Sequence, residues 1–337
     1  MTGQQVPPEA QLAQLTNGYQ VTQAIHVAAE LRVADHVGDK PVEAAAIAGA
    51  VGVDPGALYR LMRALATVGI FAETDERAFV STPMSELLRS DHPRSFRGWP
   101  AFVGGQLHWA AWGTLTESVR TGVDAHRMRF GQSVWEYRED KPDETVRFTA
   151  AMAAVSGTAA KAIVDAFDFG RFPRLVDVGG ADGFLLATIL SVTPGAAGVV
   201  FDLPHVVLAV EDVAARFGLQ GRLRAEGGSY FDIIPPGGDA YILKSILHDC
   251  PDDDCVRVLR NVRAAMPESG RLLVVEAVLG QRPTPRDAFS DINMLVNTGG
   301  RERREDEWRA LLSEAGFQIS GISPTASPFS VIECRPG

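Results

Sequence analysis

Polar or glycine residues stand at the ends of three successive apolar stretches in the second half of the chain. The first ends in "DVGGADG" (177–183), where glycines let backbone approach a ligand and the next helix would turn unpaired N–H groups toward an anion. The second ends at Asp202, whose carboxylate suits the two hydroxyls of a ribose. The third ends in "EGGSYF" (226–231), which offers Ser229 for hydrogen bonding and Phe231 for stacking. These residue types suit a ligand that contains a ribose.

Two further stretches end in groups that can move a proton. The fourth, "DAYILK" (239–244), is followed by "SILHD" and brings Lys244 and His248 near its end. The fifth ends at Glu276. A neutral imidazole is a sensible base for a phenol, and a carboxylate beside it would fix the tautomer and stabilise the imidazolium. A lone histidine is more often structural, so it is the strand-end position of His248 that favours a catalytic role.

Each of these signals has a plainer alternative. The glycine loop is not a dinucleotide fingerprint, because G-x-G-x-x-G would need a glycine where Ala181 stands. By itself the loop is equally consistent with a tight strand-to-helix turn, and Ala181 is expected to keep a negative φ there. Glu276 is also explained as a strand-end charge, and Glu302, in "GGRERRE", as one partner of an exposed ion pair with a neighbouring arginine.

A doubly wound parallel sheet would bring these strand ends together. Helical stretches of roughly 10 to 20 residues separate the apolar runs, as the crossovers of such a sheet require. Ligands bind at the carboxyl ends of its strands. The predicted strands are 174–178, 198–203, 222–228, 239–244 and 271–278, and "FQISGIS" (317–323) with "FSVIECR" (329–335) predicts a terminal hairpin.

The first part of the chain predicts a winged helix-turn-helix. Residues 11–40 read as helical, and Asp54 with Pro55 begins a further helix that ends at Gly69. A small hairpin, "IFAETDERAFVST" (70–82), follows. Residues 41–90 hold four arginines, no lysine and six acidic residues, which gives a net charge of −2. DNA-binding modules carry a basic face, so packing or dimerisation is the favoured role.

Composition narrows the class of protein. The 337 residues are 46% hydrophobic and 22% charged, which is typical of a globular protein with a sizeable core. The net charge of −10 argues against general binding of nucleic acids or anionic membranes. No run of 18 apolar residues appears, and the N-terminus lacks the pattern of a secretory signal, so a cytoplasmic protein is expected. The cysteines, predicted to be buried free thiols, are Cys250, Cys255 and Cys334.

As a set, the motifs resemble those of S-adenosylmethionine-dependent O-methyltransferases of the plant caffeate and bacterial polyketide-tailoring type. They are "DVGGADG", "FDLP", "GGSYFDIIPPGGDAYILKSILHD", "LLVVEAVL" and "DINMLVNTGGRERREDEW", in the family's order and spacing. The resemblance covers nearly the whole chain. It implies a Rossmann-like α/β fold with a seven-stranded class I methyltransferase sheet (residues 106–337), behind a mainly α winged-helix dimerisation domain (residues 1–105). It also implies S-adenosylmethionine as cofactor and a homodimer.

The resemblance also assigns roles to residues. His248 would be the catalytic base, flanked by Glu276 and Glu302, and no metal is expected. The family often has aspartate where Ser229 stands, and a serine hydroxyl is a weaker acceptor for the adenine amino group. The predicted cofactor residues are Asp177, Gly179, Asp202, Gly228, Ser229, Tyr230, Phe231, Lys244 and Ser245. The predicted acceptor-side residues are Trp135, Phe148, Met152, Asn293, Met294 and Asn297.

The resulting function is methyl transfer to a hydroxyl of a small aromatic acceptor, as in natural-product pathways. The aromatic candidates fit phenols, naphthoates, phenazines and polycyclic polyketides alike. One alternative is a relative that binds the same cofactor but decarboxylates or hydroxylates, against which His248 argues. Another is a winged-helix transcriptional regulator, against which the missing basic face argues.

Overall fold

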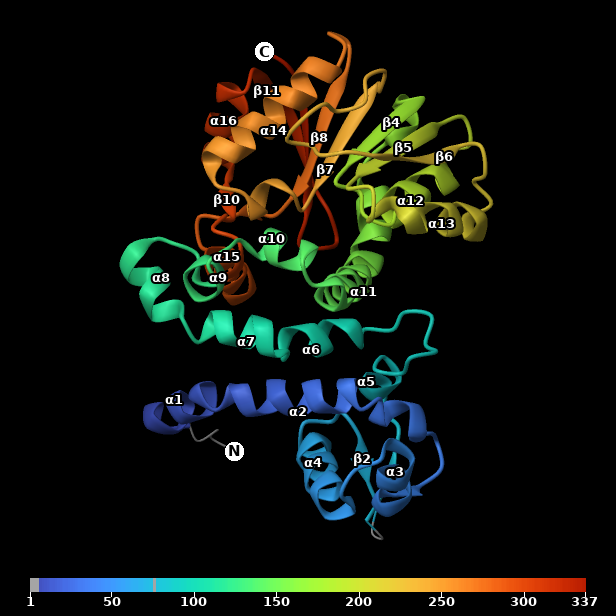
Figure 1. The fold of residues 1–337 in the computed structure, drawn as a ribbon, viewed down its shortest axis with the longest axis vertical. Helices are drawn as coiled ribbons and strands as arrows, with labels where there is room; N and C mark the ends of the chain where they lie inside the picture. Colours follow the sequence, from blue (N-terminus) through green and yellow to red (C-terminus); the bar gives the residue numbers. More distant parts are fainter. Residues whose placement is uncertain (1–5, 75–76) are drawn as a thin grey trace, which may run out of the picture. The chain divides into compact units, whose positions relative to one another are not determined.

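The chain divides into two compact units, each described here by itself (Figure 1). Unit 1 comprises Met1–Ala110 and Lys141–Val155, and unit 2 comprises Ala111–Asp140 and Ser156–Gly337. The structure is a computed structural model that describes residues 6–74 and 77–337. The first five residues of the predicted N-terminus and the turn of the predicted hairpin at 75–76 lie outside the described residues. Two helices, α7 (Gln106–Trp112) and α11 (Pro142–Ala166), contain residues of both units.

Unit 1 contains the predicted winged-helix elements. Helix α4 begins after Asp54, whose side chain accepts a hydrogen bond from the Ala57 amide at 2.7 Å, with Pro55 at its first position. The sheet has one strand more than predicted, because β1 pairs with β3 in the order β1-β3-β2. The elements are α1 (Pro8–Thr16), α2 (Gly18–Glu30), η1 (Val33–His36), β1 (Val42–Glu43), α3 (Ala44–Val51), α4 (Pro55–Thr67), β2 (Ala72–Glu73), β3 (Ala78–Val80), α5 (Pro83–Glu86) and α6 (Gly98–Val103).

Unit 2 contains the seven-stranded sheet, in the order β11-β12-β8-β7-β4-β5-β6. The five strands from β4 to β8 are parallel, and β12 runs antiparallel to its neighbours β8 and β11. This confirms the predicted class I sheet. The strands are β4 (Arg174–Val178), β5 (Ala197–Asp202), β6 (Leu223–Gly227), β7 (Ala240–Lys244), β8 (Arg271–Glu276), β11 (Phe317–Pro324) and β12 (Ser330–Pro336), with a separate pair of β9 (Val278–Leu279) and β10 (Arg303–Arg304).

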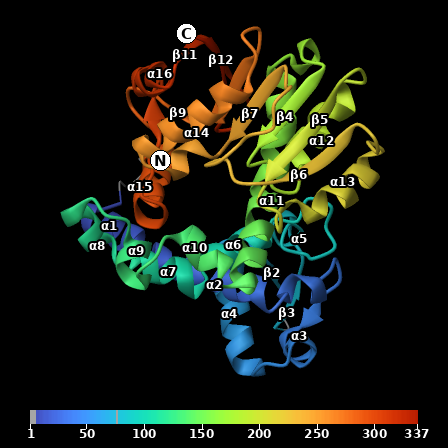
Figure 2. The ribbon, with the colours of Figure 1, turned by 45° about the horizontal axis from the view of Figure 1, so that its top comes forward.

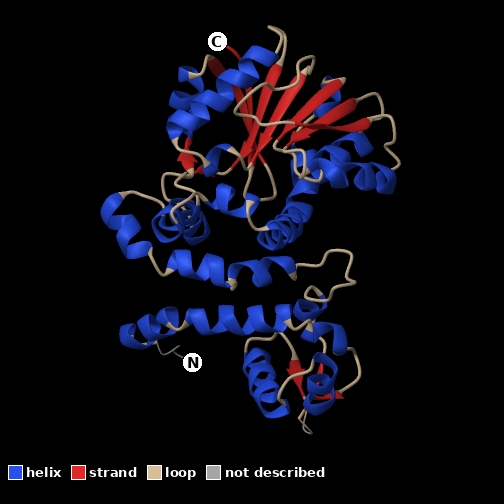
Figure 3. Ribbon diagram, in the orientation of Figure 1, coloured by secondary structure: helices blue, strands red, loops and turns tan. Residues whose placement is uncertain are grey.

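Helices cover both faces of this sheet, with α12 and α13 on one face and α14 and α16 on the other (Figures 2 and 3). In β7, Ala240 and Ile242 pack in the first core while Tyr241 and Leu243 pack in the second, as the two-residue period of a strand requires. The helices of unit 2 are α8 (Leu115–Thr121), α9 (Ala125–Phe130), α10 (Val134–Glu139), η2 (Phe169–Arg171), α12 (Phe184–Val192), η3 (Val207–Ala209), α13 (Val210–Phe217), η4 (Leu247–Asp249), α14 (Asp252–Ala265), α15 (Pro285–Asn297) and α16 (Glu305–Glu314).

The parallel strands point to one edge of the sheet, so their carboxyl ends meet there (Figure 3). All three cysteines are buried free thiols, as predicted. Among the described residues, no helix is both long enough and apolar enough to cross a membrane.

Candidate active site

The turn that carries His248 is fixed by Glu276. After β7 the chain reverses through Ser245, which has a left-handed φ of 55°. The next three backbone N–H groups, of Ile246, Leu247 and His248, then converge on Glu276 Oε1 at 3.0, 3.0 and 3.3 Å. Glu276 is completely buried at the end of the adjacent strand β8. One of its oxygens therefore anchors the η4 turn, and only Oε2 is left to face the imidazole.

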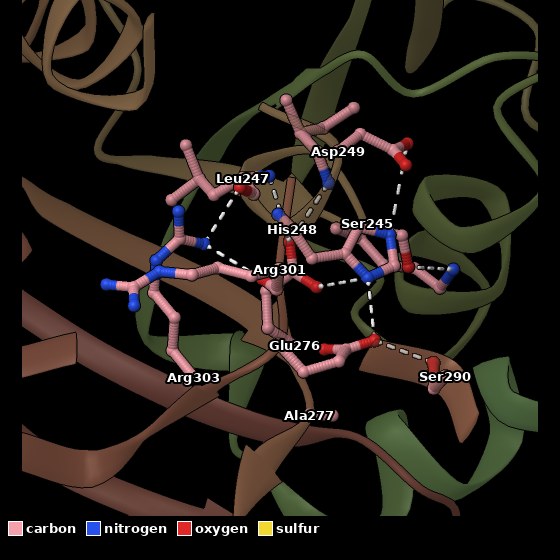
Figure 4. Close-up of polar contacts among 12 residues, drawn as sticks. Ser245, Leu247, His248, Asp249, Glu276, Ala277, Ser290, Arg301 and Arg303 are labelled. Carbon is pink, nitrogen blue, oxygen red and sulfur yellow. Dashed lines mark hydrogen bonds and ion pairs between the residues drawn. The ribbon is translucent and has the colours of Figure 1, made fainter. Parts of the chain in front are cut away.

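The His248 ring lies among three carboxylates (Figure 4). Its Nδ1 is 3.1 Å from Glu302 Oε1 and 3.6 Å from Glu276 Oε2, and its Nε2 is 3.9 Å from Asp249 Oδ2. The shortest contact makes Nδ1 the donor to Glu302, so the neutral ring would keep its lone pair on Nε2. The ligand atoms of His248, Glu276 and Glu302 also lie within 4.8 Å of one another, a spacing compatible with a metal ion.

Helix α15 holds Glu302 in place. Ser290 donates to Glu302 Oε1 at 2.8 Å, and the Glu302 amide donates to Asp291 Oδ1 at 2.9 Å. Glu302 is 4% exposed, which excludes the alternative of an exposed ion pair. The sequence analysis missed Ser290, Asp291 and Asp249. Asp249 follows His248 directly in "LHD", and Asp291 opens the motif "DINMLVNTGGRERREDEW", so both carried a signal, whereas Ser290 carried none.

The close spacing of the carboxylates shifts the pKa values of His248, Glu276 and Glu302. Burial lowers the pKa of His248, but the negative charges of Glu276, Asp249 and Glu302 outweigh it and raise that pKa to about 10. Burial, with the neighbouring Glu302 and Asp249, raises the pKa of Glu276 to about 7. The hydrogen bond from His248 and its charge hold the pKa of Glu302 below its ordinary value despite burial. The three carboxylates thus favour the protonated form of the imidazole over the neutral one.

The charge of Asp249 interacts with two positively charged side chains, those of Arg138 and Lys244, as well as with His248. Burial raises the pKa of Asp249, while the positive charges of His248, Arg138 and Lys244 act in the opposite direction. The Lys244 ammonium donates to Ser156 Oγ at 3.3 Å and lies 3.2 Å from Ser245 Oγ. Burial lowers the pKa of Lys244. The groups that face His248 and its neighbours thus come from α10, β7, β8, η4 and the segment before β10.

The predicted cofactor residues at the ends of β4, β5 and β6 meet at Asp202. The Ala181 amide donates to Asp202 Oδ2 at 3.0 Å, and the Leu203 amide donates to Oδ1 at 2.7 Å. The Gly228 amide donates to the Asp202 carbonyl at 2.9 Å. Burial raises the pKa of Asp202. Each carboxylate oxygen has a further lone pair, so Asp202 can still accept from a ligand.

The expectation of a negative φ at Ala181 was wrong: its φ is 51°. A left-handed residue aims the Ala181 amide at Asp202, and this hydrogen bond joins the loop to β5. For a residue with a Cβ the left-handed conformation costs about 1–2 kcal/mol.

Replacing Ala181 with glycine should relieve that strain. We expect Ala181→Gly to raise the free energy of unfolding by about 0.5–1 kcal/mol, since the larger freedom of unfolded glycine offsets part of the gain. Urea unfolding measures the change. Ala215→Gly, on the exposed face of α13, is the control and should destabilise by about 1 kcal/mol. A lower free energy of unfolding for Ala181→Gly would contradict backbone strain at Ala181.

The glycines and aromatic residues around this loop are closely packed. A Cβ at Gly179 would lie 2.4 Å from Ile246 Cδ1, and one at Gly228 would lie 2.5 Å from the Phe201 ring. Tyr230 lies beside Gly179. The predicted adenine residues Ser229 and Phe231 are adjacent, with the Phe231 amide donating to Ser229 Oγ at 3.2 Å, and the Arg257 guanidinium lies 5.1 Å from the Phe231 ring centre.

Asp177 is a buried carboxyl at the end of β4, next to the glycine loop. It is 1% exposed, and neither carboxylate oxygen has a hydrogen-bond partner among the described residues. Burial raises its pKa to about 7, although the Lys244 charge acts against this. A buried carboxylate without partners is costly unless something else engages it. Its oxygens are covered, so it acts on the neighbouring residues through its charge or its proton.

The acceptor-side predictions divide between the two units. In unit 2, Asn293 Oδ1 accepts from Trp112 Nε1 at 3.1 Å and from Asn297 Nδ2 at 2.9 Å. Met294 and Asn297 are buried, and Trp135 lies with its ring centre 5.0 Å from the Arg138 guanidinium. Phe148 and Met152 belong to unit 1, where the Phe148 ring lies 5.8 Å from that of Phe102. Their predicted place at the site stays a prediction.

Comparisons with known proteins fit this arrangement. Residues 112–318 match the O-methyltransferase domain, and residues 13–91 match the O-methyltransferase dimerisation domain. A phenazine O-methyltransferase of Lysobacter antibioticus is 39% identical, over 98% of this chain and 97% of its own length. An 8-amino-8-demethylriboflavin N,N-dimethyltransferase of Streptomyces davaonensis is 38% identical, over 97% of this chain and 96% of its own.

A solved structure shows a related fold with ligands bound. It is an O-methyltransferase from neocarzinostatin biosynthesis, in complex with S-adenosylmethionine and 2-hydroxy-5-methyl naphthoic acid. It superposes with a TM-score of 0.80 at 33% identity, over 94% of this chain and 96% of that one. With both of the family's domains present in order, the chain belongs to the O-methyltransferase family and is an S-adenosylmethionine-dependent methyltransferase.

Proposed function

We propose that the enzyme methylates a hydroxyl group of a small aromatic acceptor and that His248 acts as the general base. The observation that carries this proposal is the orientation of the imidazole: Glu302 holds Nδ1 at 3.1 Å, which leaves Nε2 to accept a proton. Two of the related enzymes named above support an aromatic acceptor: one is a phenazine O-methyltransferase, and the other was solved with a hydroxylated naphthoic acid.

S-adenosylmethionine supplies an electrophilic methyl group on a positively charged sulfur. The residues that would hold it converge on the carboxyl edge of the sheet. They are Asp177, Gly179, Asp202, Gly228, Ser229, Tyr230, Phe231, Lys244 and Ser245. The remaining task of the chain is to align the acceptor oxygen and to remove its proton. His248 Nε2 takes that proton, and Glu302 and Glu276 stabilise the imidazolium that results. The acceptor would lie among the unit 2 residues Trp135, Asn293, Met294 and Asn297.

This assignment predicts an alkaline rise in activity. His248 is a base only when neutral, and the surrounding carboxylates raise its pKa, so kcat/KM should increase with pH above neutrality. A cation bound at the cofactor residues would lower the pKa of His248 by like-charge repulsion. The rise in kcat, which reports the enzyme with cofactor bound, should therefore lie at lower pH than the rise in kcat/KM for S-adenosylmethionine, which reports the free enzyme.

Glu302→Gln should move this rise to lower pH. The variant removes the closest negative charge from Nδ1, so the pKa of His248 falls by about one unit, while the maximal rate drops about tenfold because the tautomer is no longer fixed. Rates measured from pH 6 to 10 test both effects, and Glu305→Gln, on the exposed face of α16, is the control. A rise that stays in place would remove His248 from the reaction.

Transfer to an aromatic amine is a second candidate, because one relative is an N,N-dimethyltransferase. A neutral arylamine carries a free lone pair and needs no deprotonation before it attacks. His248→Ala would then leave methylation of an aniline nearly intact while abolishing that of the matching phenol. Rates for such a pair of acceptors separate the two functions.

We also propose that the enzyme is a homodimer assembled through unit 1. The match to the dimerisation domain supports this proposal, as do the exposed apolar side chains of Leu12, Leu15 and Tyr19 on α1 and α2. Burial of these side chains between two copies would form an isologous interface.

A further inference from the structure

A completely buried arginine bonds to the turn that carries His248. Arg303 follows Glu302 in the chain and is 0% exposed. Its Nη1 donates to the Leu247 carbonyl at 2.9 Å, and its Nη2 donates to the Cys250 carbonyl at 3.3 Å. These two carbonyls flank His248 and Asp249, so the guanidinium spans the η4 turn.

The remaining contacts fix the guanidinium itself. Asp252 Oδ1 accepts from Nη2 at 2.6 Å and from Nε at 3.3 Å, and the Arg301 carbonyl accepts from Nη1 at 3.2 Å. The buried ring of Trp308 lies with its centre 5.2 Å from the guanidinium carbon. Burying a charge is costly unless it is paired and hydrogen-bonded, and Arg303 satisfies both conditions.

Glu276 and Arg303 bind opposite sides of the peptide group that joins Leu247 to His248. Glu276 accepts hydrogen bonds from N–H groups at the start of η4, whereas Arg303 donates to the carbonyls of Leu247 and Cys250. Arg303 is also covalently next to Glu302, whose Oε1 contacts the ring at 3.1 Å. The same side chain therefore connects the backbone that carries the base to the backbone that carries its partner carboxylate.

We propose that Arg303 is the positioning residue that sets the distance between Glu302 and His248. This inference rests on the proposed function for its effect on turnover. The effect of Arg303 on geometry can be tested separately from turnover, because the distance between Glu302 and His248 also determines the protonation of the imidazole.

Two neighbours show that the packing here is specific. A Cβ at Gly300 would lie 2.0 Å from the His248 carbonyl, so this loop and η4 already touch through backbone. Arg301 also pairs with Asp252, at 3.0 Å, but its side chain is 46% exposed and its other partner is Glu307. Arg301 has the charge and the carboxylate partner of Arg303 without the bonds to η4, which makes it the matched control.

The test uses Arg303→Met, Arg303→Lys and Arg301→Met in the full-length enzyme. The pKa of His248 is read by NMR titration of isotope-labelled histidine, with His248→Ala to assign the signal. Loss of a nearby positive charge alone would raise the pKa of His248, whereas a wider gap to Glu302 would lower it. We expect Arg303→Met to lower it by about one unit, Arg303→Lys to lower it by less, and Arg301→Met to leave it unchanged.

Turnover gives the second readout. Arg303→Met should reduce kcat about tenfold, with the Kd for S-adenosylmethionine changed less than about twofold, because the cofactor residues lie on other elements. If Arg303→Met does not fold, Arg303→Lys carries the same comparison. An unchanged or raised pKa for His248 would overturn the proposal. If the pKa falls but His248→Ala retains activity, the positioning role stands and the general-base role fails.

Discussion

His248→Ala should lower kcat for a phenolic acceptor by roughly 10²–10⁴, the usual contribution of a positioned general base. The affinity for S-adenosylmethionine should barely change, since the imidazole contacts Glu302 and Glu276, whereas Asp202 bonds to the backbone of Ala181 and Leu203. The fold should tolerate the change, because Glu276 holds the turn through backbone N–H groups rather than through the imidazole. Steady-state rates and calorimetry on the same preparation measure both quantities.

The dependence on the acceptor identifies the mechanism. The defect should shrink for phenols whose hydroxyl is already acidic, and at high pH, where solvent removes the proton. A histidine that only shapes the pocket would give the same defect for every acceptor, and catalysis would then come from alignment alone. His36→Ala, at an exposed position of unit 1, controls for the loss of an imidazole as such.

Asp202→Ala should weaken the binding of S-adenosylmethionine about a hundredfold. Two charge-assisted hydrogen bonds to the ribose hydroxyls account for about 3 kcal/mol, and tenfold in affinity corresponds to about 1.4 kcal/mol. The loss includes a second effect, because Asp202 also accepts the Ala181 amide and so holds the loop. Calorimetry gives the change in affinity, and thermal unfolding without ligand shows how far the loop has loosened.

Asp202→Asn separates the two effects. The amide keeps an acceptor for the Ala181 N–H but loses the charge, so the loop should stay in place while affinity still falls. Asp212→Ala, on the exposed surface of α13, should bind like the unmodified enzyme. Equal affinity in Asp202→Ala would remove Asp202 from the cofactor site.

The sequence predicted the strands of unit 2 closely, because buried parallel strands leave apolar runs with sharp ends. Residues 174–178 form β4 as predicted, and the predicted strand at 239–244 begins one residue later, at Ala240. The predicted strand at 271–278 is interrupted after Glu276, where β9 leaves the sheet to pair with β10. Propensity does not reveal such a break, because Val278 and Leu279 are themselves good strand residues.

The grouping of His248, Glu276 and Glu302 was predicted through strand-end positions and family resemblance, but the details of their contacts were not. The hydrogen bonds from backbone N–H groups to one oxygen of Glu276 depend on the left-handed conformation of Ser245. A serine in the sequence does not predict that conformation. The conformation of Ala181 was missed for the same reason. Ser290 and Arg303 look like ordinary surface residues in the sequence, and only the fold brings Ser290 to Glu302 and buries Arg303.

The buried carboxyl of Asp177 links protons to ligand binding. Its pKa is about 7 in the fold against an ordinary 3.8, so its full contribution to stability is present below pH 3.8 and is lost as pH rises to about 7. The loss is on the order of 4 kcal/mol. A cation bound nearby would lower that pKa through its charge, without touching the covered oxygens, and its binding would release a proton. We therefore expect the affinity for a cationic ligand bound near Asp177 to increase as pH rises toward neutrality, because binding favours the charged carboxylate.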